Sequence, residues 1–364
     1  MSLPPAGGPR LRELGLSIGR FEAGPLDAIT DVEGVAVGHV TVWRDEPEPP
    51  SGRGVARTGV TAVVPEPADT LFARPVPAGV AVLNGAGELT GSLAVREWGL
   101  LETPVYLTST HAVGRVYDGA VAAAVAADPA VGVEDVVIPV VGECDDGWLS
   151  NARVVQVEVG DAARAVDVAS SGPVGEGAVG AGAGMLTKGF KSGIGTSSRV
   201  VAGLGTVGVL VLANFSAPPG LVIDGVPVGD LLGGSDTSRR KSAGSCIVVI
   251  AVGAPLSSAQ LERVARRAGL GLARSGSVAH HGSGEIFLAF SPPARVPRGE
   301  APAAPPPDRT LDDLFEAVVD ATEESVVNAL WAAPEVTGRD GRVARALPHD
   351  DVLALLERSG RLAR

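Results

Sequence analysis

The chain has 364 residues, a formal charge of -12 and a pI near 4.9, so it offers no basic face for nucleic acid or anionic lipid. Hydrophobic residues make up 45% of the chain and charged residues 20%, which excludes intrinsic disorder and allows a substantial core. The only cysteines, Cys144 and Cys246, exclude a disulfide framework and a Cys-rich zinc site, and each is expected to be a small buried hydrophobe. Small-molecule or peptide chemistry is favoured.

Targeting and membrane-spanning segments are not expected in this sequence. The N-terminal stretch "MSLPPAGGPRLRELGLSIGR" lacks the apolar core of a signal peptide, and no later apolar run approaches the roughly 20 residues of a membrane span. We therefore expect a cytoplasmic protein with no membrane partner. Because composition shows no deep break, residues 1–364 are expected to form a single domain.

In the first half of the chain, short β-rich runs alternate with turn signals. The expected strands are 32–43, 58–65, 79–87, 135–142, 152–160 and 206–215. The Ala-rich segment 117–128 is rich in helix formers and predicts a helix. Residues 247–252 are apolar at every position, which is typical of a strand covered on both faces.

The second half predicts one further strand, at 284–290, among helices. Apolar residues at helical spacing predict helices over 257–276, 311–333 and 350–360. We expect Glu323 and Glu324 to be helix N-terminal or solvent-facing charges. The Pro-rich stretch 291–310 is expected to be a surface loop. Strands and helices mixed throughout indicate the α/β class.

Two motifs suggest ligands but are better explained by structure. The run "GAVGAGAGMLTKG" at 177–189 lacks the strand–loop–helix context and downstream acid of a dinucleotide site, so it indicates close backbone packing or a hairpin. His280 and His281 would point to opposite faces of a strand, with no further ligand set at metal spacing. We expect no metal site and no cofactor.

A small set of polar residues lies at strand ends and suggests catalysis. Ser245 follows Gly244 at the mouth of the apolar strand, where a serine is either an edge residue or a nucleophile. Ser283 and Glu285 are two residues apart, so both side chains share one strand face and can form a hydrogen-bonded relay. Asn214 ends "GVLVLANF", where its amide could donate to an oxyanion.

Two further segments carry carboxylates where strands emerge into loops. Glu143 follows "VVIPVVG", and the glycine-rich stretch 84–91 places Asn84 and Glu88 where backbone can approach a ligand. Each of these residues also has an ordinary reading as a strand-end polar group that satisfies local backbone. Their joint occurrence favours a site.

Long segments in order along the chain resemble the family of β-peptidyl aminopeptidases and L-aminopeptidase/D-esterase-amidases. The likeness rests on "AITDVEGVAVGHVTV", "RTGVTAVVP", "VLNGAGELTG", "VVIPVVGECDDGWLSN", "FKSGIGTSSRVV", "LVLANF", "GSCIVVIAV", "GSGEIFLAF" and "TGRDGRVARALPHDDVLALL". It implies a four-layer αββα sandwich, similar in layering to N-terminal-nucleophile hydrolases but differently connected. It also implies a homo-oligomer and a precursor that cuts itself.

The resemblance assigns roles residue by residue. Gly244-Ser245 resembles the autocleavage bond, which would give chains 1–244 and 245–364, and Ser245 resembles the nucleophile. Ser283 and Glu285 match the hydroxyl–carboxylate pair. Asn214 matches the oxyanion donor, and Glu143 matches the acid that holds the ammonium group of a peptide, amide or ester substrate. The sequence departs from some relatives at Asp145, where an aromatic residue is expected.

The chemistry agrees with these assignments. A serine hydroxyl needs a base, and no histidine lies in a suitable motif, whereas an N-terminal α-amine with a pKa of about 7.7–8.0 is partly neutral in the cell. Cleavage would create that amine, so Ser283 and Glu285 would have to assist the first attack. Two alternatives remain: an acyltransferase of the ornithine acetyltransferase type, which uses threonine as nucleophile, and a non-catalytic binding relative.

Overall fold

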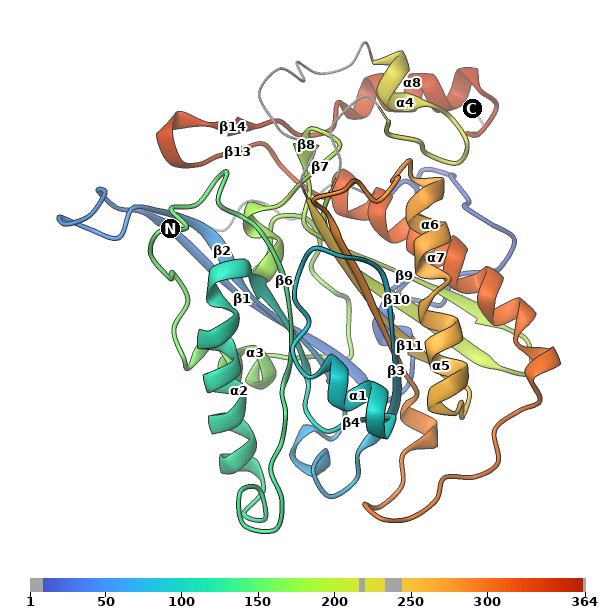
Figure 1. Cartoon of the computed structure of the whole chain (residues 1–364). Helices are drawn as coiled ribbons and strands as arrows, with labels where there is room; N and C mark the ends of the chain where they lie inside the picture. Colours follow the sequence, from blue (N-terminus) through green and yellow to red (C-terminus); the bar gives the residue numbers. More distant parts are fainter. Residues whose placement is uncertain (1–8, 216–219, 233–243, 363–364) are drawn as a thin grey trace.

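Two β-sheets facing each other form the centre of the computed structural model, which describes residues 9–215, 220–232 and 244–362 (Figure 1). The smaller sheet has four strands in the order β1 (Val35–Asp45), β2 (Val55–Pro65), β5 (Val105–Ser109) and β6 (Val140–Cys144). The larger has six, in the order β4 (Leu100–Leu101), β3 (Val76–Gly85), β12 (Gly284–Phe290), β11 (Ser245–Val252), β10 (Gly205–Asn214) and β9 (Ile194–Val201).

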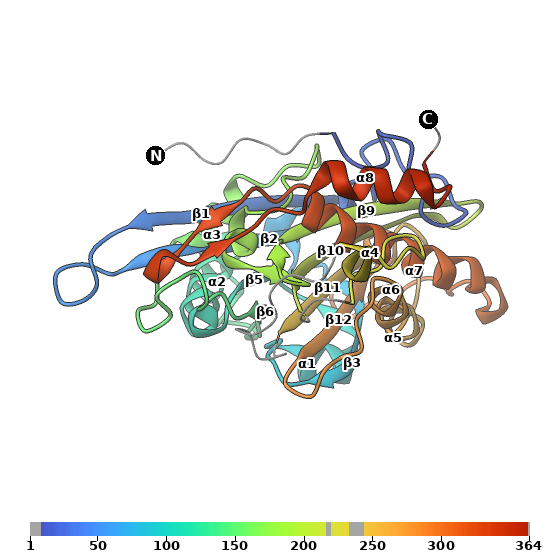
Figure 2. The same ribbon diagram turned by 90° about the horizontal axis from the view of Figure 1, so that it is seen from above.

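Helices cover the outer face of each sheet. Small residues on α2 (Val113–Ala127) and α3 (Asp161–Asp167) pack on the four-stranded sheet. The six-stranded sheet is covered by α5 (Ser258–Ala265), α6 (Ala268–Arg274) and α7 (Asp312–Trp331). Figures 1 and 2 show the resulting succession of helices, sheet, sheet and helices, which confirms the predicted four-layer αββα sandwich.

Strand β11 shows why its sequence is apolar at every position. Ile247 and Val249 belong to the core between the two sheets, whereas Cys246 and Val248 belong to the core under the helices. Both faces of the strand are therefore removed from water, as the sequence predicted. Both cysteines are buried free thiols, which confirms their expected place.

Smaller elements lie around this core. They are the helices α1 (Ser92–Trp98), α4 (Val228–Leu231) and α8 (His349–Arg358), and the strand pairs β7 (Leu186–Thr187) with β8 (Phe190–Lys191) and β13 (Val336–Thr337) with β14 (Val343–Ala344). The glycine-rich run forms a buried 3-10 turn, Gly180–Gly184, followed by the β7–β8 hairpin. The predicted close packing and hairpin are both present.

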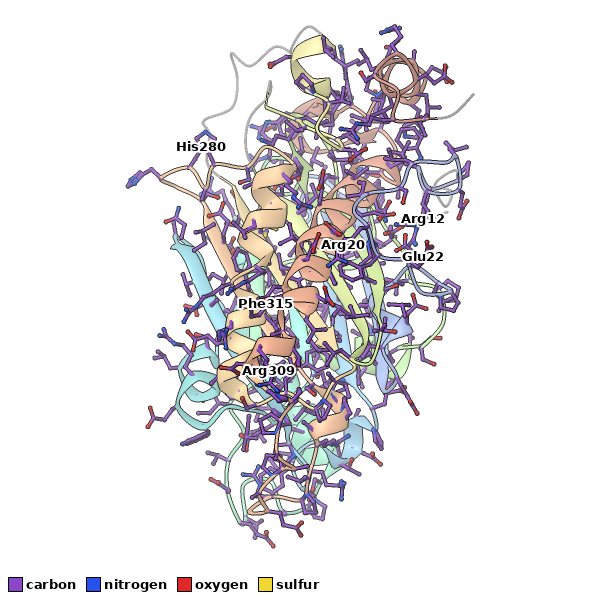
Figure 3. All side chains as sticks on the ribbon, turned by 90° about the vertical axis from the view of Figure 1, so that its right-hand side faces the viewer. Arg12, Arg20, Glu22, His280, Arg309 and Phe315 are labelled. Carbon is purple, nitrogen blue, oxygen red and sulfur yellow. The ribbon has the colours of Figure 1, made fainter. Side chains whose placement is uncertain are left out.

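Two expected elements differ in the structure. Residues 152–160 form a loop rather than a strand, because side chains take the backbone carbonyls that a neighbouring strand would use. Arg53 donates to the carbonyl oxygens of Val155 and Gln156, and Arg44 also donates to that of Gln156. The single helix expected over 257–276 is divided into α5 and α6, which pack on α7. Figure 3 shows Phe315 of α7 on this face, and the guanidinium of Arg267 lies 3.8 Å from its ring centroid.

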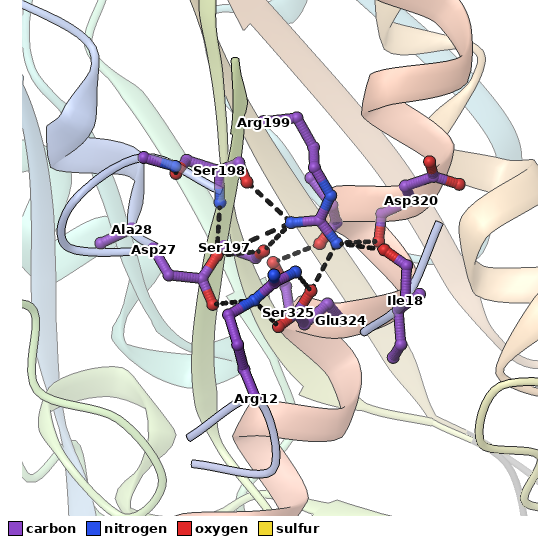
Figure 4. Close-up of polar contacts among 12 residues, drawn as sticks. Arg12, Ile18, Asp27, Ala28, Ser197, Ser198, Arg199, Asp320, Glu324 and Ser325 are labelled. Carbon is purple, nitrogen blue, oxygen red and sulfur yellow. Dashed lines mark hydrogen bonds and ion pairs between the residues drawn. The ribbon is translucent and has the colours of Figure 1, made fainter. Parts of the chain in front are cut away.

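The prediction for Glu323 and Glu324 was wrong, because both are buried in the middle of α7. Glu324 pairs with Arg12, at 2.6 Å, and with the fully buried Arg199 of β9. Asp27 completes the cluster, since its carboxylate lies 3.6 Å from Arg199 (Figure 4). These ion pairs hold the N-terminal segment against β9 and α7, so the glutamates are internal partners rather than solvent-facing charges.

The Pro-rich stretch runs over the surface for most of its length. Residues 299–310 are almost all exposed, whereas Ser291 and Ala294 are buried at its beginning. Among the described residues, no helix has both the length and the apolar character needed to cross a bilayer.

Candidate active site

Three neighbouring strands of the larger sheet bring the predicted polar residues together at one end. Asn214, the last residue of β10, pairs in register with Ser245, the first residue of β11. On its other side Ser245 pairs with Gly284, the first residue of β12. A row of residues from three separate segments of the sequence therefore crosses the sheet edge, with Ser245 at its centre.

The hydroxyl of Ser245 and the Ser283–Glu285 pair lie on opposite faces of this sheet. Alternation along β11 directs Ser245 to the same side as Ile247, between the sheets, and Cys246 to the helix side. Phe287 lies two residues after Glu285, so both side chains are on the same face of β12. Because Phe287 faces the helices, Glu285 does so too. The pair thus lies across the sheet from the Ser245 side chain, with Glu285 opposite Cys246 in the register of β11 and β12.

Ser283 and Glu285 are directly hydrogen-bonded, as their spacing predicted. The Ser283 hydroxyl donates to Oε1 of Glu285, and both side chains are buried. Oε2 of Glu285 is also buried and has no hydrogen-bond partner among the described residues. Burial raises the pKa of the Glu285 carboxyl, and the hydrogen bond from Ser283 opposes part of that rise.

Glu143 reaches the site from the other sheet, at the end of β6. Its Oε1 accepts a 3.0 Å hydrogen bond from the backbone N–H of Glu88, and its Oε2 accepts one from the hydroxyl of Thr110. Burial raises the pKa of the Glu143 carboxyl, and these two hydrogen bonds oppose the rise. The carboxylate is thus held in one orientation.

Gly87 separates Glu143 from the serine. A Cβ atom placed on Gly87 would lie 3.2 Å from Glu143 Oε1 and 3.8 Å from Ser245 Oγ. The Glu143 carboxylate and the Ser245 hydroxyl therefore border the same small space beside Gly87, and the absence of a side chain on Gly87 leaves that space open.

The side-chain amide of Asn214 is fixed on two sides. Its Oδ1 accepts a 3.0 Å hydrogen bond from the backbone N–H of Leu186, and its Nδ2 donates, at 2.8 Å, to the carbonyl oxygen of Asp145. The Oδ1 atom faces the β7–β8 hairpin. The amino group therefore faces the end of β6, where Glu143 also lies. The two contacts therefore fix which way the amide group points.

Asn84 and Glu88 lie beside the site, in different settings. Asn84 pairs with Glu285 in the sheet, and its Nδ2 donates at 2.9 Å to the carbonyl oxygen of His280, the loop residue marked in Figure 3. Glu88 is exposed, and its backbone N–H rather than its carboxylate contacts Glu143. Asn84 thus fixes the loop before β12. The side chain of Glu88 is exposed to solvent beside the site.

Gly244 is the first described residue before the serine, and it packs tightly. A Cβ there would lie 2.3 Å from the carbonyl oxygen of Asn214 and 2.7 Å from Cα of Phe215. Such approaches exclude any larger residue without movement of the backbone.

Thr110 is a site residue that sequence reasoning missed. It follows β5, which pairs in parallel with β6 so that Thr108 lies opposite Glu143. Parallel strands end at the same sheet edge, so the polar residues at the end of "VYLTST" were the sequence signal that could have identified Thr110.

Sequence reasoning also missed Lys191. Its ammonium group donates to the carbonyl oxygens of Gly182, Met185 and Ser192, and these hydrogen bonds stabilise the turn beside Leu186.

No group of three or more His, Cys, Asp or Glu side chains in the described part of the chain is placed to hold a metal ion. The donors assembled at the site are instead hydroxyls, carboxylates and an amide. Such a set can supply a nucleophile, an ammonium-binding acid and an oxyanion donor.

Comparison with known proteins gives concordant results. The sequence profile of Peptidase family S58 matches residues 27–344. The beta-peptidyl aminopeptidase BapA of Sphingosinicella microcystinivorans is 40% identical over 98% of this chain and 94% of its own, and BapA of Sphingosinicella xenopeptidilytica is 40% identical over 96% and 91%.

Solved structures agree with this result. The L-aminopeptidase D-Ala-esterase/amidase of Ochrobactrum anthropi, described as a prototype serine aminopeptidase and a variant of the Ntn hydrolase fold, superposes with a TM-score of 0.89 at 39% identity, covering 98% of this chain and 100% of its own. A Burkholderia sp. beta-aminopeptidase superposes with a TM-score of 0.86 at 40% identity, covering 97% and 99%.

Proposed function

The chain belongs to peptidase family S58 and is an aminopeptidase, and from that premise we propose that it cuts its own Gly244–Ser245 bond and then uses Ser245 as its catalytic nucleophile. The observation that carries this proposal is the row Asn214–Ser245–Gly284, with Ser245 Oγ and Glu143 Oε1 bordering the same space at Gly87. The acyltransferase alternative receives no support from these relatives.

Self-processing would begin with attack of Ser245 Oγ on the carbonyl carbon of Gly244. The Ser245 hydroxyl loses its proton as the new C–O bond forms, and the nitrogen of Ser245 takes up a proton as the C–N bond breaks, which makes it an amine. Water then hydrolyses the ester, which releases the Gly244 carboxylate. Ser283 and Glu285 stand on either side of Gly284, the residue that pairs with Ser245, so we assign them the transfer of the proton to the departing nitrogen.

Turnover would repeat this chemistry on a substrate. The Ser245 hydroxyl attacks the substrate carbonyl and gives its proton to the new α-amine, which passes it to the leaving amine or alcohol. Water then hydrolyses the acyl-enzyme. Asn214 Nδ2 would stabilise the oxyanion, while Glu143 would bind the free ammonium group, with Asn84 and Glu88 bordering the pocket.

The substrates would be small peptides, amides or esters with a free amine. We also propose a cytoplasmic homo-oligomer that binds neither nucleic acid nor membranes. The acidic pI supports the first exclusion, and large apolar side chains that remain exposed on α1, Leu93 and Trp98, support self-association. Light scattering on the purified protein tests the oligomer.

Intact-mass measurement with a Ser245→Ala variant tests the central proposal. The wild-type protein should contain two chains, 1–244 and 245–364, of about 24 and 12 kDa by length, that remain associated because β10 and β11 pair along their whole length. Ser245→Ala should remain uncut and inactive, whereas Ser245→Cys should still be cut, since a thiol is the better nucleophile. An uncut wild-type chain with full activity would overturn the proposal.

A further inference from the structure

Buried acids divide into two groups in the described part of the chain. Those far from the site each lie within ion-pair distance of an arginine: Asp27, Asp161, Asp320, Glu323 and Glu324. The remaining three, Glu143, Asp146 and Glu285, form no ion pair within the described ranges, although the charge of His111 acts on Asp146, and all three are at or next to the site. The molecule thus pairs its buried carboxylates except where a substrate would bind.

Asp145 adds an exposed carboxylate to this unpaired group. It lies two residues after Glu143, and its backbone carbonyl accepts the hydrogen bond from Asn214, so it borders the oxyanion donor. Its Oδ1 accepts a 2.8 Å hydrogen bond from the N–H of Gly147, which fixes the carboxylate without neutralising it. The negative charges of Asp145 and Glu88 both act on Glu143.

A small cavity next to Asp145 provides an independent indication of a ligand. Asp145, Asp146 and Thr110 line it, and Thr110 is the residue that holds Glu143. Oδ2 of Asp146 and Oγ1 of Thr58, which also lines the cavity, are buried without a hydrogen-bond partner among the described residues. Buried polar atoms of this kind normally have a partner, and a carboxylate oxygen beside a hydroxyl oxygen can both accept from a cationic donor.

One substrate ammonium group would neutralise Glu143 and leave the exposed carboxylate of Asp145 without an ion pair in the described part of the chain. We propose that the site selects substrates whose first residue carries a second ammonium group, as a lysine-type side chain does, and that Asp145 is the specificity-determining residue that pairs with it. This inference rests on the proposed function and names the substrate class of the same site. An ammonium group suits the cavity because it is compact and carries three donors.

Lysine and norleucine p-nitroanilides test the inference, because their side chains differ chiefly in the terminal ammonium group. The processed enzyme should favour the lysine substrate in kcat/KM, and Asp145→Asn should lower that preference about five- to tenfold. Asp118→Asn is the matched control, since Asp118 is an exposed carboxylate of α2 that has no ion pair within the described ranges. It should leave the preference unchanged. The wild-type preference should also fall as ionic strength rises.

The outcomes separate this inference from the proposed function. Turnover of both substrates at equal rates by the wild-type enzyme would overturn the lysine preference while leaving the aminopeptidase mechanism intact. Failure of a processed enzyme to release nitroaniline from either substrate would count against the proposed function itself. If Asp145→Asn lowers both rates by the same factor, Asp145 acts through Asn214 rather than on the side chain, and the specificity role is wrong.

Discussion

The backbone N–H of Gly284 donates a 3.2 Å hydrogen bond to the carbonyl oxygen of Gly244. This carbonyl belongs to the bond that we propose is cut. A donor already placed on its oxygen would polarise the carbonyl and stabilise the negative charge that develops when Ser245 attacks. The parallel pairing of β11 with β12 therefore serves the reaction as well as the sheet.

Gly244→Ala should slow self-processing at least about tenfold, because a Cβ 2.3 Å from the Asn214 carbonyl oxygen would displace the Gly244 carbonyl from Gly284. The fraction of uncut chain followed over time by mass spectrometry measures the effect. Gly114→Ala is the control, since a Cβ on Gly114 would meet no atom within 4 Å. Normal cutting of the Gly244→Ala chain would show that the carbonyl position is unimportant.

Glu285→Gln should slow both processing and turnover by about 10²-fold, because the amide cannot deliver the proton that we assign to this pair at the nitrogen of Ser245. Ser283→Ala should slow the same two steps. Burial raises the pKa of Glu285, so activity should fall as pH rises through that raised value and the carboxyl group loses its proton.

The same raised pKa predicts a change in stability. A carboxyl group whose pKa is raised on folding favours the folded state at low pH and loses that contribution as pH rises from its ordinary value through the raised one. Glu285→Gln should therefore raise the free energy of unfolding at neutral pH, as measured by urea denaturation. A destabilised variant would mean that the carboxylate has a partner that the mutation breaks.

Blocking the substrate amine should abolish turnover, because an N-acetyl group cannot form an ion pair with Glu143. Glu143→Gln should lower kcat/KM for free-amine substrates about 10²-fold by leaving the ammonium group unpaired. Burial raises the pKa of Glu143, so its ionisation should limit kcat/KM on the acidic side, and that limb should vanish in the variant. Equal rates on acetylated and free substrates would contradict the role of Glu143.

Glu324→Ala should destabilise the fold by about 3–5 kcal/mol, because it removes the nearer of the two carboxylates that pair with the fully buried guanidinium of Arg199. Asp313→Ala, which breaks an exposed pair with Arg20, should cost far less stability. Urea unfolding of both variants measures the difference. Similar losses for the two would show that the buried cluster contributes little.

EDTA should leave the initial rate unchanged, because each step is assigned to side chains and to the new α-amine. The only adjacent histidines, His280 and His281, lie in a loop where no third ligand joins them within the described residues. Loss of activity that zinc or manganese restores would return these histidines to the mechanism.

Local patterns in the sequence determined most of the elements and the residue types of the site. Strand β12 spans residues 284–290 as predicted, and the two-residue spacing of Ser283 and Glu285 was enough to predict their hydrogen bond, since alternation along a strand is a local property. The sequence also predicted which segments end in polar residues. The αββα layering came from resemblance, because alternating elements alone do not specify how two sheets stack.

Only the tertiary structure decided which of these strand ends meet. Asn214 lies opposite Ser245 through antiparallel register, and Glu143 reaches the same space from a different sheet, held by Thr110. The burial of Glu324 depends on Arg199, more than a hundred residues earlier in the chain. Such pairings follow from the packing of distant segments, where a buried charge is stabilised by its partner, and helical periodicity carries no information about that partner.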